Sequence, residues 1–243
     1  MSADRTLAIA KRLVLQIVKD HRTVALILVA PIIVMSLVGF SFDKQRQVLD
    51  SIAPALLGAF SLFFVFILTG VSFLRERAQG TLERLLATPV GRGDVLVGYL
   101  LGFLVFAALQ AVVILLFTIY VLRIHYNGAL WQIFVFLMVL TISSVNLGIF
   151  ISTFARNEFQ VVQFIPIVLM PQLFLAGIFL PVDQLPWYFQ GIANVLPLTY
   201  AIEGLRDIML HGKGLLDVTK DLAVMFGYAV VLLVAAALTV RRT

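Results

Sequence analysis

Long stretches without Asp, Glu, Lys or Arg alternate with short polar segments along the whole chain. Seven of these stretches are 19 residues or longer: 23–42, 51–74, 95–122, 124–155, 159–182, 184–202 and 222–240. About 20 apolar helical residues cross the roughly 30 Å hydrocarbon core of a bilayer, because a helix rises about 1.5 Å per residue. Residues 184–202 contain Pro186, Pro197 and several amides, a composition typical of an interfacial or re-entrant segment. We therefore predict six spans, at residues 23–42, 51–74, 95–122, 130–153, 159–180 and 222–240.

The basic residues predict the orientation of these spans. With six spans and a cytoplasmic N-terminus, 12 of the 18 Lys and Arg residues fall on the cytoplasmic side. This bias obeys the positive-inside rule, whereas seven spans would place Arg241 and Arg242 outside. Both termini are therefore expected in the cytoplasm, and residues 181–220 form the outer segment before the last span.

Composition agrees with an integral membrane protein of one all-α domain, residues 1–243. The 243 residues are 61% hydrophobic and 13% charged, with a mean hydropathy of +1.05. Soluble domains carry about 25% charged residues. The chain has no cysteine and only three well-separated histidines, so we expect no metal site. The net charge of +5 is explained by basic residues at membrane boundaries, and no nucleic-acid partner is expected.

The first 22 residues predict an amphipathic helix at the cytoplasmic interface. At about 100° per residue, the apolar side chains share one arc and most basic residues lie opposite. The arc contains Leu7, Ala10, Leu13, Val14, Ile17 and Val18.

The loop at residues 75–94 predicts a second short helix. Gly80 is expected to end the preceding helix, and Thr81 is expected to cap the new one. Pro89 ends it, and Asp94 is placed to cap the third span. Its apolar face, which must pack on the chain's own cytoplasmic bundle or on a partner, consists of Leu82, Leu85 and Leu86.

The run Arg-Glu-Arg-Ala-Gln-Gly-Thr-Leu-Glu-Arg-Leu-Leu-Ala-Thr-Pro-Val, residues 75–90, resembles the loop of type-2 ABC exporter permeases, especially the drug and antibiotic-resistance branch. The likeness extends over the chain, including the interfacial helix, six spans and outer re-entrant segment. It implies a homodimer that binds two copies of a separate ABC ATPase, with the loop helix as the coupling helix. The matching contact positions are Glu76, Gly80, Thr81, Leu82, Glu83, Leu85, Leu86 and Pro89, with Arg156, Asn157 and Glu158 in a second, smaller loop.

The energy source is expected to lie on another chain. No Gly-x-x-x-x-Gly-Lys-Ser/Thr run is present, so ATP and Mg²⁺ are expected on the partner ATPase and this chain is not an enzyme. The spans hold no Asp, Glu or Lys, and only Arg123 and His125 lie at an outer edge, so proton or sodium coupling is not expected.

The resemblance also implies a translocation path. The second and fifth spans line the central cavity in the related exporters, and in this chain they are rich in Phe, Met, Pro and Gln. An aromatic cavity without fixed charge favours a hydrophobic or amphipathic small-molecule cargo. The expected lining residues are Phe63, Phe66, Phe73, Gln163, Met170, Gln172 and Phe174.

Two alternatives stay open at this point. One is a permease for a lipid-linked polysaccharide, and the other is a membrane scaffold or sensor that recruits a soluble partner through the loop without transport. In each case we expect a multi-pass protein among membrane lipids, and the lack of cysteine suits a prokaryotic inner membrane.

Overall fold

The computed structural model describes residues 2–88 and 90–239, which are helical wherever they are regular and include no strand. Six of the described helices are long and apolar enough to cross a membrane, so the predicted all-α, six-span fold is confirmed. They are α2 (His21–Ser41), α3 (Arg46–Ala78), α5 (Arg92–Leu116) continued by the π-helix η1 (Phe117–Val121), α6 (Leu130–Ser152), α7 (Glu158–Leu175) and α10 (Thr219–Thr239).

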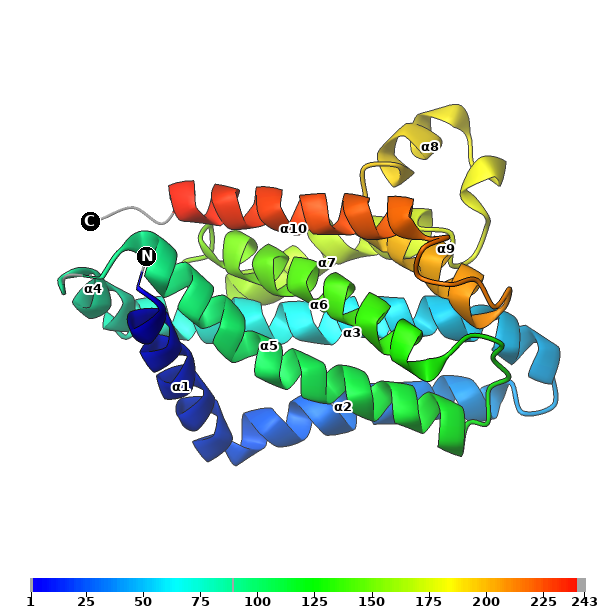
Figure 1. Cartoon of the computed structure of the whole chain (residues 1–243), viewed down its shortest axis with the longest axis horizontal. Helices are drawn as coiled ribbons and strands as arrows, with labels where there is room; N and C mark the ends of the chain where they lie inside the picture. The colour runs from blue at the N-terminus through cyan, green and yellow to red at the C-terminus, as the bar shows by residue number, and fades with distance from the viewer. Residues whose placement is uncertain (1, 89, 240–243) are drawn as a thin grey trace.

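Five shorter elements flank the long helices. They are α1 (Ala3–Lys19), α4 (Thr81–Leu86), the 3₁₀ turn η2 (Val182–Gln184), α8 (Trp187–Ala193) and α9 (Pro197–Met209). The long helices run roughly along one axis, with α1 and α4 at one end and α8 at the other (Figure 1). The segments predicted to be cytoplasmic therefore gather at one end. The side of the membrane that this end faces stays a prediction.

The largest differences between the helix boundaries and the predicted spans are in α3 and α7. Helix α3 begins at Arg46 and continues to Ala78, beyond both ends of 51–74. Helix α7 ends at Leu175 rather than at 180, because Gly177 adopts a left-handed φ of +85° and turns the chain. The last residue of the sixth predicted span, Val240, lies outside the described residues.

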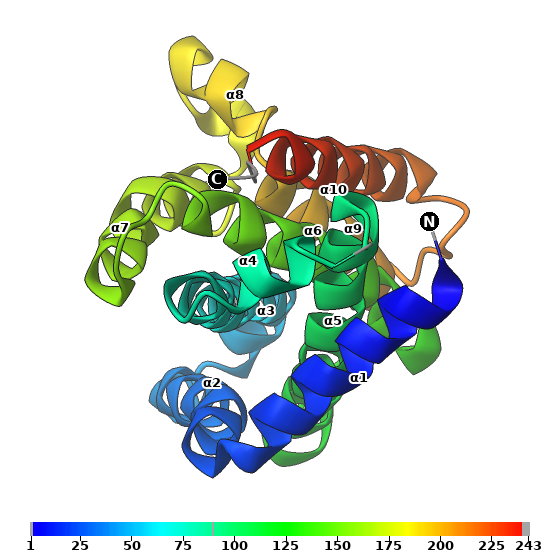
Figure 2. The same ribbon diagram turned by 90° about the vertical axis from the view of Figure 1, so that its left-hand side faces the viewer.

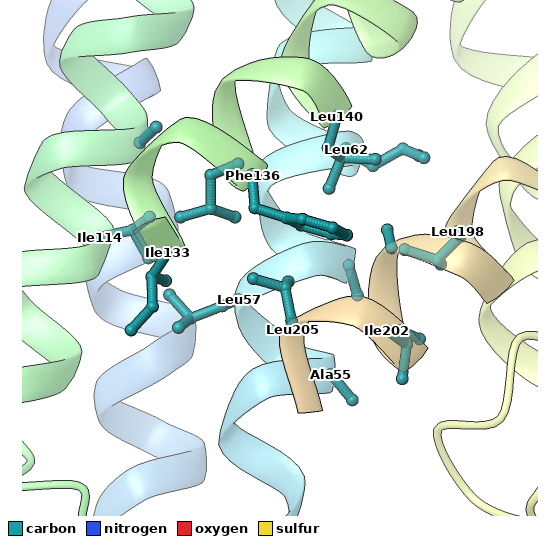
Figure 3. Close-up of a cluster of buried hydrophobic side chains, with 14 of the residues drawn as sticks. Ala55, Leu57, Leu62, Ile114, Ile133, Phe136, Leu140, Leu198, Ile202 and Leu205 are labelled. Atoms are coloured by element: carbon teal, nitrogen blue, oxygen red, sulfur yellow. The ribbon is translucent and has the colours of Figure 1, made fainter. Parts of the chain in front are cut away.

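The main core joins α3, α6 and α9. The Phe136 ring of α6 lies among Leu57 and Leu62 of α3 and Leu205 of α9, all almost fully buried (Figure 3). Helix α9 belongs to the predicted outer segment 181–220, yet it packs deeply into the bundle. By contrast, Trp187 of α8 is 83% exposed. The depth at which this segment lies in the membrane stays a prediction.

Two side chains fasten α6 to α10. The amide of Asn146 donates to the Ala229 carbonyl at 2.9 Å, and the hydroxyl of Ser143 donates to the Met225 carbonyl at 2.8 Å. Both side chains are buried, so these bonds have no competing water.

We expect Asn146→Ala to destabilise the bundle by about 1 kcal/mol, because the Ala229 carbonyl loses its interhelical donor. The melting temperature in detergent, followed by circular dichroism, should fall by about 2–4 °C. Ser36→Ala is the control, because the Ser36 hydroxyl donates within its own helix, to Ile32. Equal melting of the two variants would contradict this account.

Helices α2, α7 and α10 leave large apolar side chains uncovered. Leu37 of α2, Ile167 of α7 and Leu238 of α10 are each more than 60% exposed. Such surfaces are stable only against lipid or another apolar surface.

Candidate functional site

A sharp turn connects α3 to the short helix α4 at the end of the bundle that also holds α1 (Figure 2). Gly80 has a left-handed φ of +67° and is the N-cap of α4. This conformation favours glycine, which explains why α3 ends here. Thr81 is the first helical residue, so its predicted role as the cap is wrong; the chain has already turned at Gly80.

The leucines of α4 pack on the chain's own bundle. Leu82 is 5% exposed and belongs to a buried cluster with Phe73 and Tyr99, and the half-buried Leu85 packs against this cluster. The sequence left open whether these leucines contact the bundle or a partner, and Leu82 contacts the bundle. The side chain of Leu86 and the whole of Pro89 lie outside what the structure describes.

The outer face of α4 and the two residues that follow it are exposed. Glu83, Ala87 and Thr88 are exposed. Arg84 is also exposed, but its guanidinium donates to the Gln79 carbonyl at 2.9 Å and to the Gly80 carbonyl at 3.3 Å. Arg84 therefore fixes α4 to the turn, and the other three residues form a surface that a soluble protein can reach.

A polar cluster centred on a buried carboxylate lies close to this turn. Glu76, near the end of α3, is 1% exposed and accepts hydrogen bonds from Arg12 at 2.5 Å, Gln16 at 2.5 Å and the Tyr99 hydroxyl at 2.6 Å. Arg12 also donates to the Tyr99 oxygen at 2.8 Å. We call these four residues the Glu76 cluster; they join α1, α3 and α5.

The charges of this cluster are matched. Burial disfavours the charged guanidinium of Arg12, but its hydrogen bonds and charge interactions with Glu76 and Tyr99 together outweigh burial and raise the pKa of Arg12. Glu76, predicted to contact the ATPase, thus has its hydrogen-bond partners within this chain. Sequence reasoning missed Arg12, Gln16 and Tyr99, because the cluster pairs residues more than 20 positions apart and no local pattern marks them.

Helix α1 crosses the start of α5 and packs on it closely (Figure 2). Gly98 and Gly102 form the contact: a Cβ built at Gly98 would lie 2.8 Å from Ile9, and one at Gly102 would lie 2.8 Å from Leu13. Asp94 is the third residue of α5, so it caps from inside the helix, accepting the Gly91 N–H at 3.2 Å. The other Asp94 oxygen accepts the Ser2 N–H at 3.0 Å and so ties the start of α1 to α5.

We expect Gly98→Leu to displace α1 from α5, because its Cβ alone would lie 3.0 Å from the Thr6 carbonyl, which is backbone. Overpacking of this kind costs about 1–3 kcal/mol. Limited trypsin digestion, read at Lys11 and Lys19, should become faster by about tenfold, the equivalent of about 1.4 kcal/mol. Gly227→Leu is the control, since nothing lies within 4 Å of a Cβ there. The packing account fails if both variants are cut at the wild-type rate.

The second predicted loop has mainly internal partners. Asn157 caps α7 by accepting the Gln160 N–H at 2.9 Å. Glu158 accepts two hydrogen bonds from Arg75 of α3, at 2.7 and 3.2 Å. Arg156 has an exposed side chain beside this ion pair.

The predicted path residues fall into two groups. Phe66 and Phe73 are 0% exposed within the single chain, so they are core residues; the Phe-rich pattern does not distinguish a core face from a lining face. Gln172 is also buried. Phe63 is half-buried. The predicted path residues that face outward from α7 are Gln163, Met170 and Phe174.

Comparison with known proteins decides the family. Residues 4–210, most of the chain, match the family described as ABC-2 type transporter. The chain belongs to the ABC-2 type transporter family. This ABC-2 chain is 32% identical over 173 residues to ABC transporter G family member 20 of Dictyostelium discoideum, covering 71% of the chain and 24% of that protein.

Two bacterial relatives carry names that refer to multidrug transport or to resistance. Over 164 residues, 27% are identical to the probable multidrug ABC transporter permease YbhR of Escherichia coli K12, covering 68% of this chain and 45% of the relative. Over 203 residues, 28% are identical to the linearmycin resistance permease protein LnrN of Bacillus subtilis, covering 82% of this chain and 52% of that relative. The ABC-2 chain thus matches between about a quarter and about half the length of these relatives, and it is a multi-pass membrane component of a transport system.

Proposed function

We propose that this ABC-2 permease exports a hydrophobic or amphipathic small molecule by alternating access, driven by ATP hydrolysis on a separate ABC ATPase. The observation that carries the proposal is the arrangement around α4. An exposed surface of Glu83, Ala87 and Thr88 lies at one end of the bundle, and Arg84 and the turn at Gly80 connect it directly to α3.

The Glu76 cluster gives this surface a way to act on the spans. A displacement of α4 would move α3 through the single turn that joins them. The Glu76 cluster would transmit this movement to α1 and α5 through short hydrogen bonds. Leu82 is packed in the same region, so α4 is not free to rock independently. In this proposal Glu76 and Leu82 position the coupling helix, while Glu83, Ala87 and Thr88 contact the ATPase.

The second loop is proposed as the smaller contact. Arg156 is its exposed cation, and Glu158 links it to α3 through Arg75. In a complex of two permease and two ATPase copies, each permease copy would contact an ATPase through both α4 and the second loop. ATP and Mg²⁺ are held by the ATPase.

The cargo and the dimer are inferred from the uncovered apolar helices. Helix α7 exposes Gln163, Met170 and Phe174, and most of its length is not buried within the chain. A second copy facing α7 would enclose an apolar path with scattered neutral polar groups, together with Phe63 of α3. Such a path suits an uncharged or amphipathic compound, and the names of YbhR and LnrN favour a drug or an antibiotic. The proposed location is a prokaryotic inner membrane.

Co-purification tests this proposal. The tagged full chain is extracted from its host in mild detergent, and the retained proteins are identified by mass spectrometry and assayed for ATPase activity. We expect an ABC ATPase in about one-to-one ratio with the permease. A folded permease that repeatedly retains a different soluble protein and no ATPase would favour the scaffold alternative and overturn the exporter.

A further inference from the structure

An apolar groove runs between α2 and α3 on the outside of the bundle. Its volume is about 250 Å³. Leu26, Ile27 and Ala30 of α2 form one wall, and Phe64 and Val71 of α3 form the other. Both walls belong to candidate spanning helices, so the groove opens toward hydrocarbon or a neighbouring apolar surface.

The α3 wall of the groove is about as long as one lipid leaflet is thick. From Phe64 to Arg75, α3 rises by about 16 Å at about 1.5 Å per residue. Half of the roughly 30 Å hydrocarbon core is about 15 Å. Arg75, at the end of α3 near α4, also lines the groove, so a chain lying in it would bring its polar end to this guanidinium.

Charges of both signs meet at that end. Nε and Nη2 of Arg75 donate to Glu158, and Nη1 faces Asp20 at 3.8 Å, too long for a hydrogen bond, so its N–H groups can serve a further acceptor. Asp20 caps α2 by accepting hydrogen bonds from the Thr23 hydroxyl and the Thr23 N–H, which lower the pKa of Asp20 and keep it ionised. Each carboxylate has lone pairs left for a cation.

We propose that this groove binds an acyl chain of a phospholipid with a zwitterionic aminoethyl-phosphate head group, whose phosphate meets Arg75 and whose ammonium meets Asp20 and Glu158. One cation flanked by two anions matches this head group. A purely anionic head group would find the phosphate partner but would face the two carboxylates without a counter-charge. The site shares Arg75 and Glu158 with the proposed second ATPase contact, but its occupancy can be measured without an ATPase or a cargo.

Native mass spectrometry of the delipidated full chain tests the proposal, with dioleoyl-phosphatidylethanolamine and dioleoyl-phosphatidylglycerol as probes. We expect the wild type to bind the ethanolamine lipid at least about fivefold more tightly. Asp20→Asn with Glu158→Gln should reverse this preference, because Arg75 then acts alone; Asn still caps α2. Equal binding, or a preference of the wild type for the glycerol lipid, would overturn the head-group assignment.

Filling the groove tests its location. Ala30→Trp places an indole in the groove and should weaken binding of the ethanolamine lipid by about tenfold. Ala25→Trp is the matched control on an exposed position of the same helix and should bind like the wild type. If Ala30→Trp does not fold, Ser72→Leu fills the groove from α3. Wild-type binding by the groove-filling variant, or retention of a second permease copy or a cargo compound there in place of lipid, would overturn the proposal.

Discussion

Glu76→Ala should release α1 from the bundle. The substitution leaves the Arg12 guanidinium and the buried Tyr99 hydroxyl without their shared carboxylate. Breaking a buried ion pair by removing one partner costs about 3–5 kcal/mol, and we expect the lower end because the Arg12 side chain is 35% exposed. Trypsin should then cleave after Lys11 and Lys19 about a hundredfold faster than in the wild type, the equivalent of about 3 kcal/mol.

Glu83→Ala is the matched control for this experiment. It removes a side chain of the same type from an exposed position of α4, where substitutions usually change stability by less than about 0.5 kcal/mol. Glu76→Gln keeps hydrogen-bonding capacity but not charge, so its cleavage rate should fall between those of Glu76→Ala and the wild type. If Glu76→Ala is cleaved no faster than Glu83→Ala, the cluster does not hold α1.

Glu83→Arg should uncouple the permease while leaving it folded. Glu83 lies on the exposed face of α4 proposed to meet the ATPase, and we propose that its carboxylate pairs there with a positive group, which an arginine would repel. We expect the amount of ATPase retained per permease to fall by about tenfold or more, which corresponds to about 1.4 kcal/mol or more. The measurement is quantitative co-purification from cells that express equal amounts of each variant.

Two controls separate this effect from misfolding and from charge in general. Glu83→Gln removes the charge without reversing it and should have a smaller effect. Lys213→Glu reverses an exposed charge in the segment between α9 and α10, which lies at the end of the bundle opposite α4 (Figure 1), and should have none. Retention of the ATPase by Glu83→Arg at the wild-type level would remove Glu83 from the contact.

Much of the fold could be predicted because hydropathy and period are local. The six spans, the amphipathic helix α1 and the break at Gly80 all follow from residues close together in sequence. The end of α7 was missed because residues 176–180 are apolar like the span itself, and only the positive φ of Gly177 marks the turn.

The candidate site could be predicted only in part. The loop pattern identified α4, but the use of Glu76 depends on Arg12, which lies 64 positions away on another helix. The same limit applies to Phe66 and Phe73: a Phe-rich span has the same pattern whether those rings face a path, lipid or a core, and the packing of α3 against α5 and α6 decides it.

Site-specific photo-crosslinking tests the central claim most directly, namely that the exposed face of α4 contacts a separate ATPase. Benzoyl-phenylalanine is introduced at Ala87, an exposed small residue, and, as the control, at Lys213 in the segment between α9 and α10 at the opposite end. Irradiation of intact cells should yield a covalent adduct of the permease with an ABC ATPase from position 87 and none from position 213. An ATPase that co-purifies but never crosslinks from position 87, or crosslinks equally from both positions, would contradict the account.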